Sequence, residues 1–337
     1  MDFVTLGSTG ITVNKNGFGA LPIQRVSDDE STRLLRKAYD NGITFIDTAR
    51  GYTTSEGKIA LALSDVRDKV VIATKAMASD TKSLNEQLET SLKLLKTDYI
   101  DVYQLHNPPF VPKPGDDSGL YDALLDVKKS GKIKHIGITN HKLKLAEEAA
   151  ESGLYEIIQF PVSYLSTPEE LDFVRLCAGK NIGVLAMKAM SGGLITNSAA
   201  AYAFLMQFEN VLPIWGVQAM KELDEFISYQ ATPPALNKEI KQAIEHDKAE
   251  LSGEFCRGCA YCMPCPVDIN ISISARMSLL MKRAPKSFYF APDWQESMKR
   301  IDNCIECGHC NANCPYGLNP PELMREAWED YRVLLED

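Results

Sequence analysis

The chain opens with a regular alternation of short apolar runs and longer stretches in which apolar residues recur at helical spacing. Eight apolar runs have the length of buried strands: residues 16–21, 43–46, 70–73, 99–105, 133–138, 156–160, 182–186 and 211–214. Strands that are apolar throughout and alternate with helices indicate a parallel sheet buried on both faces. Eight such units within roughly 230 residues fit a closed (β/α)8 TIM barrel better than an open doubly wound sheet.

Four of the intervening stretches are helix candidates: residues 27–41, 81–96, 143–152 and 167–180. Ser27 and Glu30 have the spacing of a capping box, which satisfies free amides at the start of a helix. Thr167 begins a similar pattern, with Pro168 at the first helical position, where no N–H is needed. Residues 3–13 predict a hairpin ahead of the first barrel strand.

A Thr-Pro-Pro sequence at residues 232–234 ends the alternation. Further helices are expected at residues 236–251, 272–283 and 321–335. We therefore expect three parts: an α/β TIM barrel over residues 1–232, a helical linker over residues 233–251, and a mainly helical, cysteine-rich domain over residues 252–337.

Eight of the nine cysteines form two tight runs, each ending in Cys-Pro: Cys256, Cys259, Cys262 and Cys265, then Cys304, Cys307, Cys310 and Cys314. The second run has the C-x2-C-x2-C-x3-C-P spacing of bacterial ferredoxins, whose thiolates bind iron–sulfur clusters. The first run is one residue shorter, with Met263 and Pro264 before its last cysteine. The spacing predicts two [4Fe-4S] clusters in a ferredoxin-like domain.

Two other uses of the cysteines fit less well. Structural zinc sites usually take two C-x2-C pairs separated by a longer stretch. Here, four cysteines recur within each run, with only two or three residues between one cysteine and the next. A disulfide framework needs an oxidising compartment, and the sequence shows no secretory leader. We expect a cytoplasmic protein in which the ninth cysteine, Cys177, is an inert core residue.

The composition is that of an ordinary globular protein, with 45% apolar and 24% charged residues in a chain of 337. A formal net charge of −9 argues against a nucleic-acid partner, because phosphate binding requires a basic face. No apolar run approaches the roughly 18 residues that indicate a membrane helix. Neither nucleic acid nor a membrane is expected as a partner.

The ends of the expected strands carry several proton-handling groups. Asp47, Lys75 and His106 end the second, third and fourth strands, and Tyr52 follows Asp47 in the next loop. The active site of a TIM barrel is built at the carboxyl ends of its strands, so these four side chains should share one rim. Each alone has an ordinary explanation as a surface or structural residue, but four on one rim indicate an active site.

Several pieces of the sequence resemble the aldo-keto reductase family over roughly residues 1–230. They are Leu6-Gly7-Ser8-Thr9-Gly10, Phe18-Gly19, residues 45–49 with Tyr52, Ser55 and Glu56, Ala73-Thr74-Lys75, residues 103–106, residues 137–140 and Gln159. The first cysteine run, short spacing included, is similar to the branch of that family with a C-terminal ferredoxin-type extension. The resemblance implies that Asp47, Tyr52, Lys75 and His106 form a catalytic tetrad.

Such a tetrad suits carbonyl reduction, in which hydride reaches carbon while negative charge builds on oxygen. Tyr52 is expected to donate the proton, although a tyrosine with an ordinary pKa of about 10 does so reluctantly near neutrality. Lys75, as a nearby ammonium, would lower that pKa. Asp47 would hold Lys75 in place, and His106 would orient a small-molecule carbonyl substrate.

The family pattern also implies an NADP or NAD site across the barrel mouth. The implied contact residues are Gly19, Thr139, Asn140, Gln159, Met187, Gly216 and Gln218. Three of them (139, 140 and 159) would bind the nicotinamide carboxamide, while Met187 would either pack on the ring or belong to the core. The glycine and glutamine at 216 and 218, with the helix that follows, would take the pyrophosphate and adenosine end.

Three residues depart from the family pattern. Trp215 stands where proline is usual, Phe226 stands where an adenine-binding asparagine is usual, and Glu222 lies near the expected place of the 2′-phosphate. An acidic residue repels a phosphate, so the sequence leaves the choice between NADPH and NADH open.

The two halves handle electrons differently, because nicotinamide gives two as hydride and each cluster passes one. In one interpretation the barrel is an ordinary reductase that the clusters stiffen or regulate. In a second, ferredoxin or another redox partner feeds the clusters, which deliver electrons to a substrate or flavin in the barrel. In a third, the barrel is a scaffold and the protein is an electron carrier. The complete tetrad argues against the third.

Overall fold

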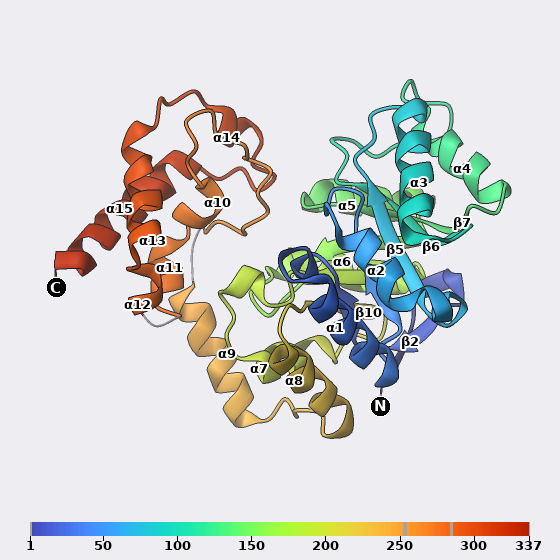
Figure 1. Ribbon diagram of the computed structural model, residues 1–337, viewed down its shortest axis with the longest axis horizontal. Helices are drawn as coiled ribbons and strands as arrows, with labels where there is room; N and C mark the ends of the chain where they lie inside the picture. Colours follow the sequence, from blue (N-terminus) through green and yellow to red (C-terminus); the bar gives the residue numbers. More distant parts are fainter. Residues whose placement is uncertain (1, 252–254, 284–285, 337) are drawn as a thin grey trace. The chain divides into compact units, whose positions relative to one another are not determined.

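The computed structural model describes residues 2–251, 255–283 and 286–336. The chain up to Ala189, together with Ala201–Leu236, forms a compact unit around a closed barrel (Figure 1). The barrel order is β10-β3-β4-β5-β6-β7-β8-β9, with every neighbouring pair parallel. The strands are β3 (Gly17–Gly19), β4 (Phe45–Asp47), β5 (Val71–Ala76), β6 (Ile100–His106), β7 (Ile133–Thr139), β8 (Ile157–Pro161), β9 (Gly183–Met187) and β10 (Val211–Gly216). Each coincides with one of the apolar runs, and the predicted TIM barrel is confirmed.

The register of these strands brings polar residues to one level near their carboxyl ends. Lys75 on β5 lies opposite Gln104 on β6, His106 lies opposite Thr139 on β7, and Thr139 lies opposite Gln159 on β8. Parallel strands share one direction, so residues at their carboxyl ends meet at the same rim. This rim is where the sequence placed the tetrad.

Helices follow the strands along the chain of this unit. They are α1 (Asp28–Asp40), α2 (Ser55–Leu63), α3 (Thr81–Leu95), α4 (Leu120–Lys129), α5 (Leu143–Ser152), α6 (Pro168–Gly179) and α8 (Met220–Ala231). The Ser27 hydroxyl accepts a hydrogen bond from the Glu30 amide at 3.1 Å, which satisfies a free donor at the start of α1. Thr167 and Glu170 form the full capping box of α6, with bonds of 3.3 and 3.0 Å.

The predicted hairpin precedes the barrel. Its strands β1 (Phe3–Thr5) and β2 (Thr12–Asn14) pair antiparallel. Val4 and Leu6 pack into an apolar cluster with Phe45, the first residue of β4, so the hairpin covers the amino-terminal end of the strands. Gly7 has a φ of +53°, and a Cβ there would lie 2.5 Å from the carbonyl oxygen of Asn181, which explains the need for glycine.

A second compact unit comprises Met190–Ala200 and the chain from Asn237 onward. Its helices are α9 (Lys238–Glu250), α10 (Ile271–Ser274), α11 (Met277–Met281), α12 (Lys286–Tyr289), α13 (Pro292–Lys299), α14 (His309–Ala312) and α15 (Pro320–Glu336), while α7 (Ser198–Leu205) spans the boundary. The helix expected as a linker and the segment that follows β9 are thus both part of this unit. Residue 252, where we expected the cysteine-rich domain to begin, lies outside the described residues.

The helix predicted at residues 272–283 is helical in the structure but interrupted. Residues 272–283 form two short helices, α10 and α11, instead of one. The side-chain Nε of Arg276 donates to the Ser272 carbonyl at 2.9 Å, the acceptor that the Arg276 amide would use in a continuous helix. That amide bonds the Ile273 carbonyl instead, at 2.9 Å, and the chain turns at this point.

The second unit has its own apolar core, to which α15, α11, the residues around α10 and the end of α13 contribute. Trp328 and Tyr331 of α15 are buried, and each polar tip is satisfied. The Trp328 Nε1 donates to Asp302 at 2.9 Å, and the Tyr331 hydroxyl donates to the Tyr289 carbonyl at 2.6 Å. Among the helices of the described residues, none combines the length and apolar character needed to cross a bilayer.

Candidate functional site

The Lys75 side chain anchors the cluster of proton-handling residues at the barrel rim. Its ammonium donates to the Asp47 carboxylate and to the Thr48 carbonyl, both at 2.7 Å. Lys75 is only 1% exposed, and Asp47 on the neighbouring strand is also buried. The pair is therefore a desolvated ion pair in which each charge depends on the other.

Tyr52 and His106 complete the cluster. Tyr52 lies between β4 and α2, where its backbone forms a turn: its amide bonds the Ala49 carbonyl at 3.0 Å and its carbonyl accepts from Ser55 at 2.8 Å. The Lys75 ammonium lies 5.5 Å from the centroid of the Tyr52 ring. The rings of Tyr52 and His106 meet edge to face with centroids 6.1 Å apart. The structure thus brings all four members of the predicted tetrad together.

Burial sets the charge states within this cluster. It lowers the pKa of His106 to about 3, and the Lys75 ammonium adds to the effect, so His106 is neutral near pH 7. Burial also lowers the pKa of Lys75, while the Asp47 carboxylate opposes that shift. The rim therefore holds a neutral imidazole next to a compensated ammonium.

A chain of buried side chains links this cluster to the residues expected to bind nicotinamide. The Gln159 Nε2 donates to the second Asp47 oxygen at 3.2 Å, and its carbonyl accepts from the Gln104 amide at 3.1 Å. The Thr139 hydroxyl lies 3.3 Å from the side-chain carbonyls of both glutamines. Gln104 was not among the predicted site residues, although it lies two residues before His106, and alternate residues of a strand face the same side.

Asn140 has the properties of a ligand contact. Its side chain is fully buried, and within the described part of the chain neither its amide nitrogen nor its carbonyl has a hydrogen-bond partner. Buried amides are almost always paired, so an unpaired one at an active-site rim suits a ligand with complementary groups. A carboxamide provides both a donor and an acceptor. Met187, at the end of β9, is partly exposed, and its role stays a prediction.

The start of α8 differs from what a phosphate site requires. The Glu222 carboxylate accepts from the backbone amides of Gln218 and Ala219, at 2.9 and 3.0 Å. These N–H groups are among the donors expected to bind the pyrophosphate. The side chain of Glu222 therefore competes with a phosphate at this helix terminus, both for the donors and by charge.

The expected adenosine end is filled by aromatic side chains. Phe226 is 6% exposed and stacks on Trp215 with ring centroids 4.3 Å apart. Trp215 in turn donates its Nε1 to Asn16 at 2.8 Å, which fixes the indole. Gly19 is the last residue of β3 and pairs with Gly216 of β10, and a Cβ there would approach the Trp215 carbonyl oxygen to 3.0 Å. Its small size thus serves strand packing, and Gly216 is exposed at the end of β10.

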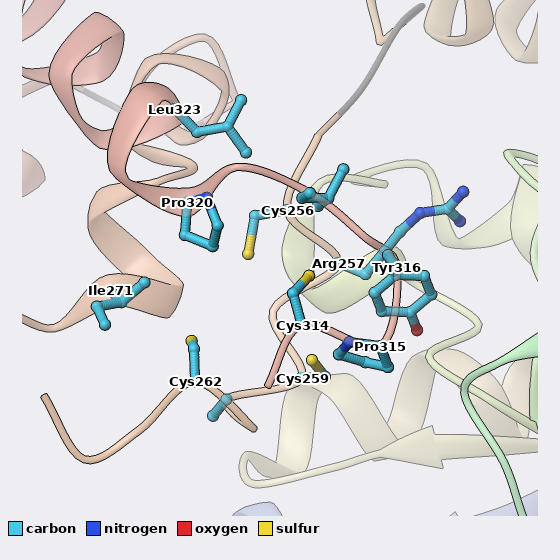
Figure 2. A pocket seen from close by; sticks show the side chains of 12 residues that line it. Cys256, Arg257, Cys259, Cys262, Ile271, Cys314, Pro315, Tyr316, Pro320 and Leu323 are labelled. Carbon is cyan, nitrogen blue, oxygen red and sulfur yellow. The ribbon is translucent and has the colours of Figure 1, made fainter. Parts of the chain in front are cut away.

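The cysteines of the second unit surround two hollows. The first is lined by Cys256, Cys259 and Cys262 from the first run and by Cys314 from the second. Figure 2 shows their sulfur atoms around a common space walled by Ile271, Pro320 and Leu323. The second hollow is lined by Cys304, Cys307 and Cys310 together with Cys265 of the first run.

Each run therefore gives its fourth cysteine to the other site. This exchange is the arrangement of two-cluster ferredoxins, in which the last cysteine of a run ligates the other cluster. Four sulfur donors in an apolar setting fit a [4Fe-4S] cluster. Without iron, burial and the neighbouring Cys256 and Cys259 raise the pKa of Cys262 to about 12, whereas a bound iron ion favours the thiolate. Cys177 belongs to α6 of the barrel unit and is fully buried, as expected of a core residue.

Fold and site together define a TIM-barrel protein with a second, cysteine-rich unit. The sequence model of the Aldo/keto reductase family matches residues 15–201, and that of a 4Fe-4S dicluster domain matches residues 255–319. The chain belongs to the aldo/keto reductase family and carries a 4Fe-4S dicluster domain at its C-terminal end.

Relatives agree with this assignment. The chain is 30% identical over 217 residues to the aldo-keto reductase YhdN of Bacillus subtilis (strain 168), a match covering 58% of this chain and 64% of that protein, which is less than two thirds of its length. It is 27% identical over 279 residues to the NADH-specific methylglyoxal reductase of Escherichia coli (strain K12), covering 70% and 84%. The holo form of aldo-keto reductase AKR11C1 from Bacillus halodurans has the same fold, with a TM-score of 0.64 at 20% identity, covering 73% and 96%.

Proposed function

We propose that the barrel reduces the carbonyl group of a small molecule to an alcohol, with hydride from a nicotinamide cofactor and a proton from Tyr52. The observation that carries this proposal is the buried Lys75–Asp47 ion pair, which holds an ammonium 5.5 Å from the Tyr52 ring centroid. A positive charge beside a phenol favours the phenolate and so eases proton release.

The other residues have distinct roles in this proposal. Asp47 keeps Lys75 charged in a dry environment, where an unpaired ammonium would lose its proton. Gln159 holds the second oxygen of Asp47 and thereby fixes the direction of the carboxylate. His106 is neutral, so its ring donates a single hydrogen bond to the carbonyl oxygen and adds no net charge to the site.

Nicotinamide would supply hydride to the carbonyl carbon. Asn140 suits its carboxamide because the buried amide lacks a described partner. We propose NADH over NADPH, since the Glu222 carboxylate is held at the start of α8 by two backbone amides and would repel the 2′-phosphate, which only NADPH carries. The name of the Escherichia coli relative states the same preference for that protein.

For the second unit, we propose two [4Fe-4S] clusters: cluster I at Cys256, Cys259, Cys262 and Cys314, and cluster II at Cys265, Cys304, Cys307 and Cys310. Exchange of the fourth ligand ties the two cysteine runs together, so the clusters also stabilise this unit. A reducing compartment such as the cytoplasm would preserve the free thiols on which both sites depend.

The Tyr52→Phe variant tests the barrel chemistry. Loss of the hydroxyl should reduce kcat for a simple aldehyde by about a hundredfold or more, the usual contribution of a positioned proton donor. The affinity for NADH should change little, because Tyr52 is not among the residues assigned to the cofactor. Anaerobic assays of NADH oxidation and NADH binding measure both quantities, and near-normal turnover would refute the assignment.

A second function is favoured by one observation, the filled adenosine end around Phe226 and Trp215. In this alternative a ferredoxin or similar carrier reduces the clusters, which pass electrons to a substrate or flavin in the barrel. An anaerobic optical titration separates the two. Reduction of the clusters by NADH alone would show that both halves exchange electrons, whereas steady aldehyde reduction with unbleached clusters supports the independent reductase.

A further inference from the structure

Arg276 is a buried arginine in the second unit whose role the proposed chemistry leaves open. It stands between α10 and α11 and is 8% exposed. Its Nε donates to the Ser272 carbonyl and its Nη1 to the Gly192 carbonyl, both at 2.9 Å. Among the described residues, no carboxylate lies within salt-bridge distance of its guanidinium. A buried cation of this kind requires negative charge from another source.

The loop that carries Cys256 and Cys259, two ligands of cluster I, lies against Arg276 and becomes negatively charged when iron converts its thiols to thiolates. Burial lowers the pKa of Arg276, and Cys256, Tyr289 and Cys259 oppose that shift. The Cys256 sulfur also lies 3.8 Å from the Ser272 carbonyl oxygen, the same oxygen that Arg276 binds. The Arg276 guanidinium therefore lies close to Cys256 and Cys259, two proposed ligands of cluster I.

Two glycines make room for this arrangement. A Cβ at Gly258, between the two cysteines, would lie 2.7 Å from Cζ of Arg276. A Cβ at Gly192 would lie 2.7 Å from its Nη1. Both glycines have a positive φ, of 61° and 65°, so a larger residue would be strained as well as obstructed. The chain thus seats the guanidinium directly against the backbone of the ligand loop.

We propose that Arg276 is a positioning residue that raises the reduction potential of cluster I. The proposal rests on the clusters proposed above. Reduction transfers one electron to the cluster from a one-electron donor such as a reduced ferredoxin, breaks no bond, and adds one negative charge to a site already bearing four thiolates. A fixed positive charge beside those thiolates stabilises the more negative state, and net charge is one of the factors that set such potentials. Burial preserves the effect, because water and salt screen it little.

The test compares Arg276→Gln with Arg276→Lys in the full-length protein, loaded with iron and sulfide under anaerobic conditions. Redox titration followed by electron paramagnetic resonance should show two one-electron steps in the wild type. In Arg276→Gln, the equilibrium constant for reduction should fall at least about tenfold for one step, which is a shift of about −59 mV for one electron. Arg276→Lys keeps the charge and should retain most of the wild-type potential.

Arg257 provides the matched control. It belongs to the same ligand loop, but it is only partly buried and its guanidinium lies over the rings of Phe255 and Tyr316, at 4.8 and 5.6 Å. Solvent screening should make the shift in Arg257→Gln smaller than in Arg276→Gln. If the Arg276→Gln protein does not retain cluster I, the Gly192→Ala variant is measured instead. Its added methyl group displaces Nη1 of Arg276 and leaves all eight cysteines unchanged. It should lower the same potential.

Each outcome is decisive. If Arg276→Gln retains both clusters and their potentials are unchanged, the proposed role of Arg276 is wrong and the proposed clusters are unaffected. The same holds for Gly192→Ala where that variant is used. Equal shifts in the Gln and Lys variants would also overturn it, because the charge would not be the cause. Absence of iron–sulfur signals in the reconstituted wild type would instead refute the proposed clusters.

Discussion

The Asp47→Asn substitution should remove the charge that compensates Lys75 while keeping the size of the side chain. The ammonium of Lys75 lies 2.7 Å from the carboxylate and is almost completely buried. Removing one partner of a buried pair usually costs about 3–5 kcal/mol, because the other charge is left without compensation. Asp47→Asn should therefore strongly lower the free energy of unfolding at pH 7.

Instead of burying an uncompensated ammonium, the Asp47→Asn protein can fold with Lys75 deprotonated. Releasing a proton from an ammonium with an ordinary pKa of about 10.4 costs about 4.6 kcal/mol at pH 7 and about 1.9 kcal/mol at pH 9. The unfolded chain then binds more protons than the folded one, so the stability of the variant rises with pH in this range. The difference from the wild type should shrink by up to about 2.7 kcal/mol between pH 7 and pH 9.

Urea unfolding at both pH values, under anaerobic conditions and followed by circular dichroism, measures this difference. Glu148→Gln is the matched control, because Glu148 also lies 2.7 Å from a lysine, Lys113, but in a solvent-exposed pair. Exposed pairs contribute about 0–1 kcal/mol. If Asp47→Asn destabilised the protein no more than Glu148→Gln, or by an amount independent of pH, the account of a compensated buried ammonium would fail.

Three further predictions concern the remaining parts of the site. Cys314→Ala should abolish cluster I, whose other ligands come from the first run, and lower bound iron by about half; loss of cluster II instead, seen by electron paramagnetic resonance, would contradict the ligand exchange. Glu222→Gln removes the repulsive charge at the start of α8 and should raise the ratio of NADPH to NADH affinity, measured by equilibrium binding; an unchanged ratio would exclude Glu222 as its cause. The pKa of His106 is lowered to about 3, so this residue should remain neutral between pH 5 and pH 8. The pH profiles of kcat/KM for the wild type and for His106→Gln should therefore show the same ionisations in that range; an ionisation seen only in the wild type would contradict a neutral His106.

The barrel could be predicted because its strands and helices leave separate marks in the sequence. Each strand is a short apolar run bounded by polar residues, and capping residues such as Ser27 and Thr167 mark helix starts in the sequence alone. The gathering of Asp47, Lys75 and His106 followed from position, since they lie at the ends of consecutive strands that must meet at one rim, whereas their role as a catalytic tetrad came from the family resemblance and stays a prediction.

Other features depend on contacts that sequence spacing does not report. Two cysteine runs are equally compatible with separate or exchanged ligands until the chain between them is folded. Glu222 could be placed near a phosphate site from sequence, but only the fold shows its carboxylate on the amides of Gln218 and Ala219. The break at Arg276 was also hidden, because residues 272–283 have ordinary helical character and the competing bond comes from a side chain.

Lys75 and Arg276 illustrate two ways to keep a cation inside a protein. Lys75 is compensated by Asp47, a carboxylate encoded in the chain, so the charge balance of the barrel rim is complete once the barrel has folded. Arg276 faces cysteines, which supply full negative charge only when iron converts thiols to thiolates. The charge balance of the second unit therefore depends on its clusters, and it changes with each electron they accept. A permanent pair suits proton transfer at a fixed site, whereas a pair whose negative member gains charge on reduction suits control of a potential.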